Sequence, residues 1–383
     1  MTVTLTYLDH AATAPMRPAA ISAMLPFFSE RFANPEGSHR FAREARRAVD
    51  EARDAVAAVL GVVPGEIVFT SGGTEGDNAA IAGAGLDRGT VVVTTAAEHH
   101  AVLEPAQRVG ARVVPVTGTG HVDLAALAGA LDAGVRLVSV MAVNNEVGTV
   151  SDLAAIAAMV RERAPQALLH TDAVQAASWI DLRTLTPLVD LMSLSAHKFG
   201  GPKGVGVLLV RAGTPLEPLL HGGGQERERR SGTHNVAGIV ALAAALAECD
   251  AERAAEVARL GGLRDVLLDG LTALDGVTAT VPREAAVPGI AHVCVEGVES
   301  EALLYLLDQA DVCAAAASAC ASGAMEPSHV LAAMGVPTAR SAGALRLSLG
   351  HTTTAADVTR ALDVIADAVP RLRTPVATWG ARR

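Results

Sequence analysis

Residues 193–204 place one lysine, Lys198, between a histidine and a glycine-rich turn, directly after an apolar segment. We expect residues 189–194 to form a buried strand, residues 200–202 a turn and residues 205–210 a second strand. Lys198 then lies at a strand end and not on a solvated helix face. A free lysine has a pKa of about 10.4, so burial is needed to make its amine nucleophilic near neutral pH. Such an amine can form a Schiff base with a carbonyl compound.

An acidic residue, Asp172, ends another apolar segment upstream of Lys198. A lysine and a carboxylate at neighbouring strand ends can bind pyridoxal phosphate, because the carboxylate keeps the pyridine nitrogen protonated and the ring then accepts electrons. Gln175 could hydrogen-bond the ring hydroxyl. Each residue alone also has an ordinary interpretation, since most lysines are solvated and most strand-end aspartates cap helices or line turns.

A glycine-rich link, residues 69–78, supplies donors for the phosphate of such a cofactor. It connects an expected strand to an expected helix, and the free amides at a helix start bind anions. Gly73 lets the backbone approach the phosphate, and Thr74 adds a hydroxyl. The same pattern also fits an ordinary helix cap. It is not a nucleotide P-loop, because no Gly-Lys-Ser/Thr follows at the required spacing.

Taken in this order, the motifs resemble the NifS/IscS-like cysteine desulfurases of the class V aminotransferase-like family. The resemblance runs from Tyr7 to about Gly350, nearly the whole chain. Besides the three motifs above, it is carried by residues 33–35, 98–101, 143–148, 221–226, 230–233 and 318–320. One such motif would be weak evidence, but about ten motifs in the same order and spacing as in the family are not expected by chance.

The resemblance implies a role for each matched residue. The catalytic residues would be Lys198, Cys320 and His99, with His99 over the pyridine face. The cofactor-binding residues would be Gly73, Thr74, His99, Asn145, Asp172, Gln175, Ser195, His197, Lys198 and, from the second subunit of a dimer, Thr233. Arg346 would bind the substrate carboxylate, assisted by Asn34, and no metal site is expected. As alternatives, His99 and His100 could be a core or surface pair, and Arg346 could form a structural ion pair.

Cys320 decides the branch within the family. It lies in a segment of small residues, 313–325, which is followed by Pro327, where a helix is expected to restart. Small side chains offer few anchors, and a cysteine that takes up sulfur and passes it on needs mobility. The family usually has Ser-Gly before Ser-Ala-Cys, whereas this chain has Ala316 and Ala317. This difference puts the flexibility of the loop and the reaction rate in question, but not the identity of Cys320 as the nucleophile. Cys249, Cys294 and Cys313 are interpreted as structural cysteines.

Composition agrees with this interpretation. The chain has 383 residues and a formal net charge of −10, which argues against direct nucleic-acid binding. Four cysteines without a disulfide-like array fit a reducing cytoplasm. The chain begins without a signal-like segment and contains no apolar run of about 18 residues, so neither export nor membrane insertion is indicated.

The elements that must position these residues follow from alternating apolar and helical patterns. Strands are expected at residues 67–70, 91–95, 112–116, 137–141, 167–171, 189–194 and 205–210. Such alternation predicts an α/β fold with a mostly parallel seven-stranded sheet between helices, as in the pyridoxal-phosphate-dependent transferases. The turn before 205–210 is too short for a helical crossover, so that strand should run antiparallel to its sequence neighbour. An amphipathic helix is expected at 38–60, ended by Gly61, and a long helix after Thr233.

We expect two domains. The large pyridoxal-phosphate-binding domain would span residues 14–246. A smaller α+β domain would comprise residues 1–13 and 247–383, carry the Cys320 segment and contain strands near 290–295 and 345–349.

The sequence thus indicates a cytoplasmic, homodimeric, pyridoxal-phosphate-dependent cysteine desulfurase that converts L-cysteine to L-alanine and passes the sulfur to an acceptor as a persulfide. The alternatives are a selenocysteine lyase or another class V aminotransferase, and a non-catalytic pyridoxal-phosphate-binding protein that docks sulfur-transfer partners. The acceptor stays open between an iron-sulfur scaffold and a tRNA-thiolation enzyme.

Overall fold

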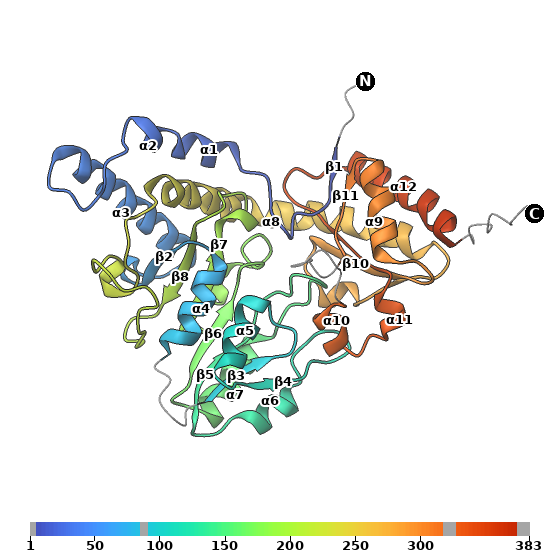
Figure 1. Cartoon of the computed structure of the whole chain (residues 1–383), viewed down its shortest axis with the longest axis horizontal. Helices are drawn as coiled ribbons and strands as arrows, with labels where there is room; N and C mark the ends of the chain where they lie inside the picture. The colour runs from blue at the N-terminus through green and yellow to red at the C-terminus, as the bar shows by residue number, and fades with distance from the viewer. Residues whose placement is uncertain (1–4, 85–90, 317–326, 374–383) are drawn as a thin grey trace, which may run out of the picture.

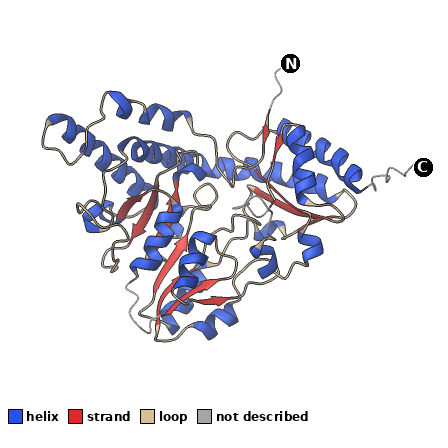
Figure 2. Cartoon of the chain, in the orientation of Figure 1, coloured by secondary structure: helices blue, strands red, loops and turns tan. Residues whose placement is uncertain are grey.

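The computed structural model describes residues 5–84, 91–316 and 327–373. A seven-stranded sheet forms its larger part, and a smaller part with two small sheets and its own helices lies beside it (Figures 1 and 2). The large sheet has the order β2-β8-β7-β6-β5-β3-β4. Its strands are β2 (Ile67–Thr70), β3 (Val91–Thr95), β4 (Arg112–Val114), β5 (Val135–Ser139), β6 (Leu168–Asp172), β7 (Leu191–Ser195) and β8 (Gly206–Val210).

The pairing in this sheet confirms the expected topology. The pairs from β4 through β3, β5 and β6 to β7 are parallel, whereas β8 is antiparallel to both β7 and β2. The short connection between β7 and β8 cannot carry the chain back to the starting edge of the sheet, so the strand after β7 must reverse direction. Gly204, with φ of 78°, helps to close that turn.

Several strand boundaries differ from those expected. The strand expected at 137–141 is β5, which starts and ends two residues earlier, although Val140 and Met141 are buried. The strand ends where its backbone hydrogen bonds to the neighbouring strands end, but the loop that follows is still buried. Its residues are therefore apolar as well, and the apolar pattern continues beyond the strand. The expected strand 112–116 stops at Val114, and Val116 forms only an isolated bridge to Val122.

Helices cover both faces of the sheet. They are α1 (Pro18–Met24), α2 (Pro26–Ser29), α3 (Arg40–Leu60), α4 (Gly73–Gly83), α5 (His100–Arg108), α6 (Leu124–Ala130), α7 (Leu153–Arg163) and the start of α8 (Val236–Thr272). The amphipathic helix expected at 38–60 is α3, which begins two residues later with His39 as its N-cap. Gly61 ends it in a left-handed conformation with φ of 66°, as expected from its sequence.

The smaller part has two small sheets within the described ranges, flanked by helices. Its strands are β1 (Thr6–Tyr7), β9 (Val277–Ala279), β10 (Ile290–Val295), β11 (Val312–Cys313) and β12 (Ala344–Ser348), and its helices are α9 (Ser300–Gln309), α10 (His329–Ala333), α11 (Thr338–Ser341) and α12 (Ala355–Arg373). The strands expected near 290–295 and 345–349 are β10 and β12.

Helix α8 links the two parts (Figure 1). Its first half, from Val236 to Cys249, packs into the core of the large sheet, and its second half, from Leu260 to Leu271, packs into the smaller core. The proposed domain boundary at residue 246 falls inside this helix and stays a prediction. Among the residues that the structure describes, no helix is long and apolar enough to cross a membrane.

Candidate active site

The candidate site lies at the carboxyl ends of β6 and β7, where open parallel sheets bind their ligands. A cavity of about 520 Å³ opens there. It is lined by Ala12, Thr13, Ser71, Gly72, Gly73, Thr74, Glu75, Ser195, His197, Lys203 and Gly204. Three of the expected phosphate-binding residues, Thr74, Ser195 and His197, therefore share one cavity although they come from separate strand ends.

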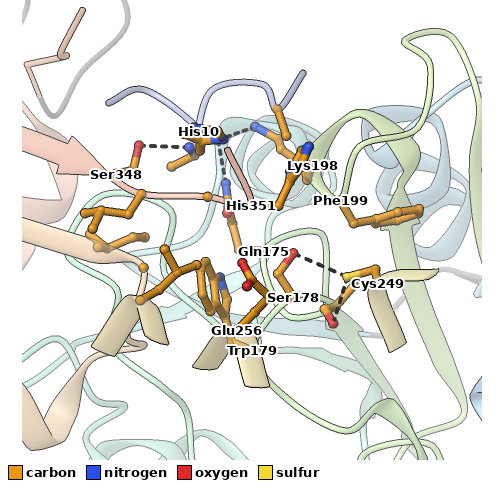
Figure 3. Close-up of a pocket in the computed structure, with 18 of the residues that line it drawn as sticks. His10, Gln175, Ser178, Trp179, Lys198, Phe199, Cys249, Glu256, Ser348 and His351 are labelled. Atoms are coloured by element: carbon orange, nitrogen blue, oxygen red, sulfur yellow. Dashed lines mark hydrogen bonds between the residues drawn. The ribbon is translucent and has the colours of Figure 1, made fainter. Parts of the chain in front are cut away.

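Lys198 lies in the 3₁₀ turn Ala196–Lys198 that follows β7. Its Nζ donates hydrogen bonds to the carbonyl oxygens of Ala11 (2.7 Å) and Ala12 (2.9 Å), so the N-terminal segment fixes the amine (Figure 3). Burial lowers the pKa of Lys198 to about 8, and the nearby Arg346 cation lowers it further than Asp172 raises it. The turn thus presents an amine that loses its proton near neutral pH.

Asp172 is the last residue of β6 and is 5% exposed. Its Oδ1 accepts a hydrogen bond from Val174 N at 2.8 Å. Burial raises the pKa of Asp172 to about 6. A buried carboxylate of this kind is stabilised by a cationic partner, and a protonated pyridine nitrogen is one.

The glycine turn before α4 is shaped for close approach. Gly72 has φ of 154°, and a Cβ on Gly73 would lie 2.5 Å from a methyl carbon of Val174. Helix α4 starts at Gly73, so its first amides point towards the cavity that Thr74 lines. Opposite the turn, burial and the neighbouring lysines lower the pKa of His197 to about 4.

His99 precedes α5 and caps it, with Nδ1 accepting a hydrogen bond from Ala101 N at 3.1 Å. His99 is exposed, yet the protein atoms around its ring desolvate it enough to lower its pKa to about 4, helped by Lys198 and His100. The ring is therefore neutral near pH 7 and can both take and give a proton. The rings of His99 and His100 lie 6.4 Å apart, edge to face.

Arg346 lies in β12 and is 6% exposed. Its Nη1 donates to the carbonyl oxygen of Asn145 and its Nη2 to Asp9 Oδ1, both at 2.8 Å. Its Nε is buried with no hydrogen-bond partner among the described residues. The guanidinium is thus anchored in an ion pair and still keeps one donor to offer. The half-buried Asn145 contacts this guanidinium through its backbone carbonyl oxygen. A hydrogen bond from the Asn145 side chain to the ring hydroxyl of the cofactor stays a prediction.

Gln175 lines the same pocket as Lys198, with Nε2 donating to the carbonyl oxygen of Ala11 at 2.7 Å (Figure 3). The two side chains share that acceptor, which brings together the Asp172 and Lys198 motifs of the sequence.

Two expected residues, Thr233 and Asn34, lie away from the other site residues that the structure brings together within one chain. Both are exposed and line neither the cavity described above nor the pocket around Lys198 and Gln175 that Figure 3 draws, and Asn34 Oδ1 accepts a hydrogen bond from Glu36 N. Cys320 lies outside the described residues. Cys249 and Cys294 are buried, as expected for structural cysteines, and Cys313 is partly buried.

Sequence reasoning missed the acidic residues around the site. Asp9 pairs with Arg346, and two fully buried acids, Asp77 and Glu98, lie near Asp172. Burial raises the pKa of Glu98 to about 8. Asp77 lies in the glycine-rich segment 69–78 and Glu98 in the segment 98–101, both of which are sequence motifs described above. Their presence in these segments was the signal that could have pointed to them.

Comparison with known proteins agrees with this geometry. Residues 6–361 match the aminotransferase class-V family. The chain is 41% identical to the cysteine desulfurase IscS of Dictyoglomus turgidum, covering 96% of this chain and 95% of that protein. It is 44% identical to an IscS-like cysteine desulfurase of Mycobacterium tuberculosis, covering 98% and 100%. A solved NifS-like protein superimposes with a TM-score of 0.90 at 36% identity, covering 96% of this chain and 100% of the other.

Proposed function

The chain belongs to the class-V aminotransferase family and, within it, to the cysteine desulfurases, and from this premise we propose that it binds pyridoxal phosphate at Lys198 and transfers the sulfur of L-cysteine to Cys320. The observation that carries the proposal is the half-buried Lys198 amine, with a pKa lowered to about 8, in the same turn as His197, which lines the cavity together with the glycine turn.

The residues present fit the cofactor. Asp172 would hold the pyridine nitrogen, Asn145 and Gln175 the ring hydroxyl, and Gly73, Thr74, Ser195 and His197 the phosphate. The free backbone amides at the start of α4, beside Thr74 in the cavity, support the phosphate assignment. When bound, pyridoxal phosphate supplies an electron sink for the substrate α-carbon.

The chain's own groups do the rest. Arg346 binds the substrate carboxylate, for which a planar guanidinium is well suited, and Asn34 assists. Lys198 and His99 hold and move protons. The Cys320 thiolate forms a bond to the substrate sulfur as the carbon–sulfur bond breaks; the electrons of that bond stay on carbon, which is protonated, and alanine leaves.

We place Thr233 at the phosphate of a second subunit, so that the active unit is a homodimer. Two observations support this placement: Thr233 is exposed in one chain, and it is not among the described residues that line the cavity of its own chain. We also place the enzyme in the cytoplasm, where the three described cysteines, all free thiols, would stay reduced. The sulfur acceptor would be a scaffold for iron-sulfur clusters or a tRNA-thiolation enzyme.

The test compares Cys320→Ser with Cys249→Ser. Serine is a far poorer nucleophile at neutral pH than a thiol, whose pKa is about 8.5. We expect Cys320→Ser to bind cofactor normally, release almost no alanine from cysteine and carry no persulfide by peptide mass spectrometry. Cys249→Ser, at a buried position, should keep both. Full alanine production by Cys320→Ser would favour a lyase that does not need the cysteine.

A further inference from the structure

A loop at the edge of the large sheet presents Thr233 to solvent. In Figure 1 this stretch, residues 220–235, lies beside α3, β2 and β8. Thr233 and Gly232 are exposed, whereas the residues on either side, Ser231 and His234, are largely buried, with 8% of Ser231 and 11% of the His234 side chain exposed. The loop therefore has a fixed base and a projecting tip.

One carboxylate holds the base of this loop. Glu226, 6% exposed, accepts hydrogen bonds from Arg53 Nη1 (2.8 Å) and Nη2 (2.7 Å) and from Phe69 N (3.0 Å). Its Oε1 also lies 2.7 Å from His234 Nε2. Burial alone would raise the pKa of Glu226, but Arg53 and His234 outweigh it and lower the pKa to about 2. A single ionised side chain thus ties α3, β2 and the residue next to Thr233 together.

The backbone around this carboxylate is strained. Glu226, Arg227 and Glu228 have φ of 52°, 57° and 66°, three successive left-handed residues without a glycine. L-residues avoid this conformation at a cost of roughly 1–2 kcal/mol each, so surrounding contacts must impose it. Among the described residues, the Glu226 bonds are the strong contacts inside the turn.

A second anchor lies on the other side of the tip. Arg230 pairs with Glu75 through two contacts, of 2.8 and 3.1 Å. Glu75 adjoins Thr74 in the phosphate-side cavity. The loop is thus clamped on both sides of residues 231–233, and only the tip is left to meet another molecule.

We propose that Glu226 is a positioning residue for the cofactor site of the second subunit: through His234 and the left-handed turn it holds Thr233 where the hydroxyl reaches the phosphate bound there. This inference rests on the shared site proposed above. Glu226 touches neither substrate nor cofactor, and its effect should appear in the site of the other subunit.

The experiment uses mixed dimers isolated with two different affinity tags. In each mixed dimer one subunit carries Lys198→Ala, so the absorbance of lysine-bound cofactor comes only from the other subunit. In the first arrangement Glu226→Gln lies on the Lys198→Ala subunit; in the second it lies on the subunit that keeps Lys198. The measurement is the rate at which pyridoxal phosphate leaves the Lys198 site for an excess of a cofactor-free acceptor protein.

We expect release to be about tenfold faster in the first arrangement and unchanged in the second. The reason is that loss of one hydrogen bond to a charged group such as the phosphate weakens binding by about this factor. His234→Ala should reproduce the pattern. Glu228→Gln, at an exposed position of the same turn, is the matched control and should change neither arrangement. If Glu226→Gln folds poorly with Arg53 left unpaired, the pair Arg53→Met with Glu226→Gln removes the buried charge and serves instead.

Thr233→Ala in the same two arrangements separates this inference from its premise. If Thr233→Ala speeds release only from its own subunit, the shared site itself is wrong. If Thr233→Ala acts across the dimer while Glu226→Gln and His234→Ala change nothing, or act only within their own subunit, the positioning role of Glu226 is overturned and the shared site stands.

Discussion

At the scale of single residues, burial moves the two principal groups of the site towards their neutral forms. It lowers the pKa of Lys198 to about 8 and raises the pKa of Asp172 to about 6. For the lysine this means that roughly a tenth of the amine is neutral at pH 7, compared with less than about one part in a thousand for a free lysine. The Lys198 amine is therefore partly deprotonated before any ligand binds.

This preparation can be measured, because the sequence contains only two lysines, Lys198 and Lys203. In cofactor-free Lys203→Arg protein, Lys198 is the single lysine, and an amine-reactive reagent followed by peptide mass spectrometry reports on it. Only the deprotonated amine reacts, so a lowered pKa moves the reaction to lower pH. We expect the labelling rate at Lys198 to reach half its maximum near pH 8; a midpoint near the ordinary lysine value of about 10.4 would contradict the burial argument. The exposed Lys203, measured in Lys198→Arg protein, is the reference.

At the scale of elements, four of the candidate site residues lie where a regular element starts or stops. Asp172 ends β6, Lys198 follows β7, Gly73 begins α4, and His99 caps α5. The ends of these elements matter more for the site than their interiors. Helix α3 contributes through its interior instead, where Arg53 contacts Glu226, and Gly61 fixes the C-terminal end of this helix.

Gly61 should therefore resist substitution. Its φ is 66°, and a Cβ there would lie 3.1 Å from Arg183 Cγ. We expect Gly61→Ala to lower the free energy of unfolding by about 1 kcal/mol, measured by urea denaturation. Gly65→Ala is the control: its φ is not positive and a Cβ there would meet no atom within 4 Å, so its effect should stay within about 0.5 kcal/mol. Equal effects at both positions would contradict the conformational argument.

At the scale of the whole molecule, the two cores share α8, and a set of large apolar side chains remains uncovered near the N-terminus. Ile21, Leu25, Phe28, Phe32 and Phe41 are between 42% and 73% exposed. They belong to α1, the single residue between α1 and α2, α2 itself, the loop after α2 and the start of α3 (Figure 1). Exposed apolar side chains gathered in this way mark an interaction surface. We propose that a second copy of the chain covers these side chains, because the shared site proposed above needs such a partner.

Phe32, 73% exposed, offers a test of that assignment. A charge in a buried apolar interface is costly, so Phe32→Asp should shift the protein from dimer towards monomer in sedimentation velocity and weaken its hold on cofactor. Tyr305→Asp alters a side chain that is 65% exposed on α9, in the smaller part, and should stay dimeric. A Phe32→Asp protein that remains fully dimeric would remove these side chains from the interface.

The sequence by itself determined the order of the motifs, the alternation that makes a mostly parallel sheet, and the reversal of β8. These depend on local spacing, apolar periodicity and turn residues, which are properties of neighbouring positions. Periodicity located most strands within two residues. It misplaced their ends, as at β5, because buried loop residues such as Val140 are as apolar as strand residues.

Only the tertiary structure decided which groups meet. Asp9 and Arg346, separated by 337 positions, form an ion pair, and the carbonyl oxygens of Ala11 and Ala12 fix Lys198. Glu226 joins Arg53 across 173 positions. No local pattern encodes such pairs, because each partner alone is compatible with a solvated surface. Burial, and with it the displaced pKa of each group, exists only once the chain has brought distant segments together.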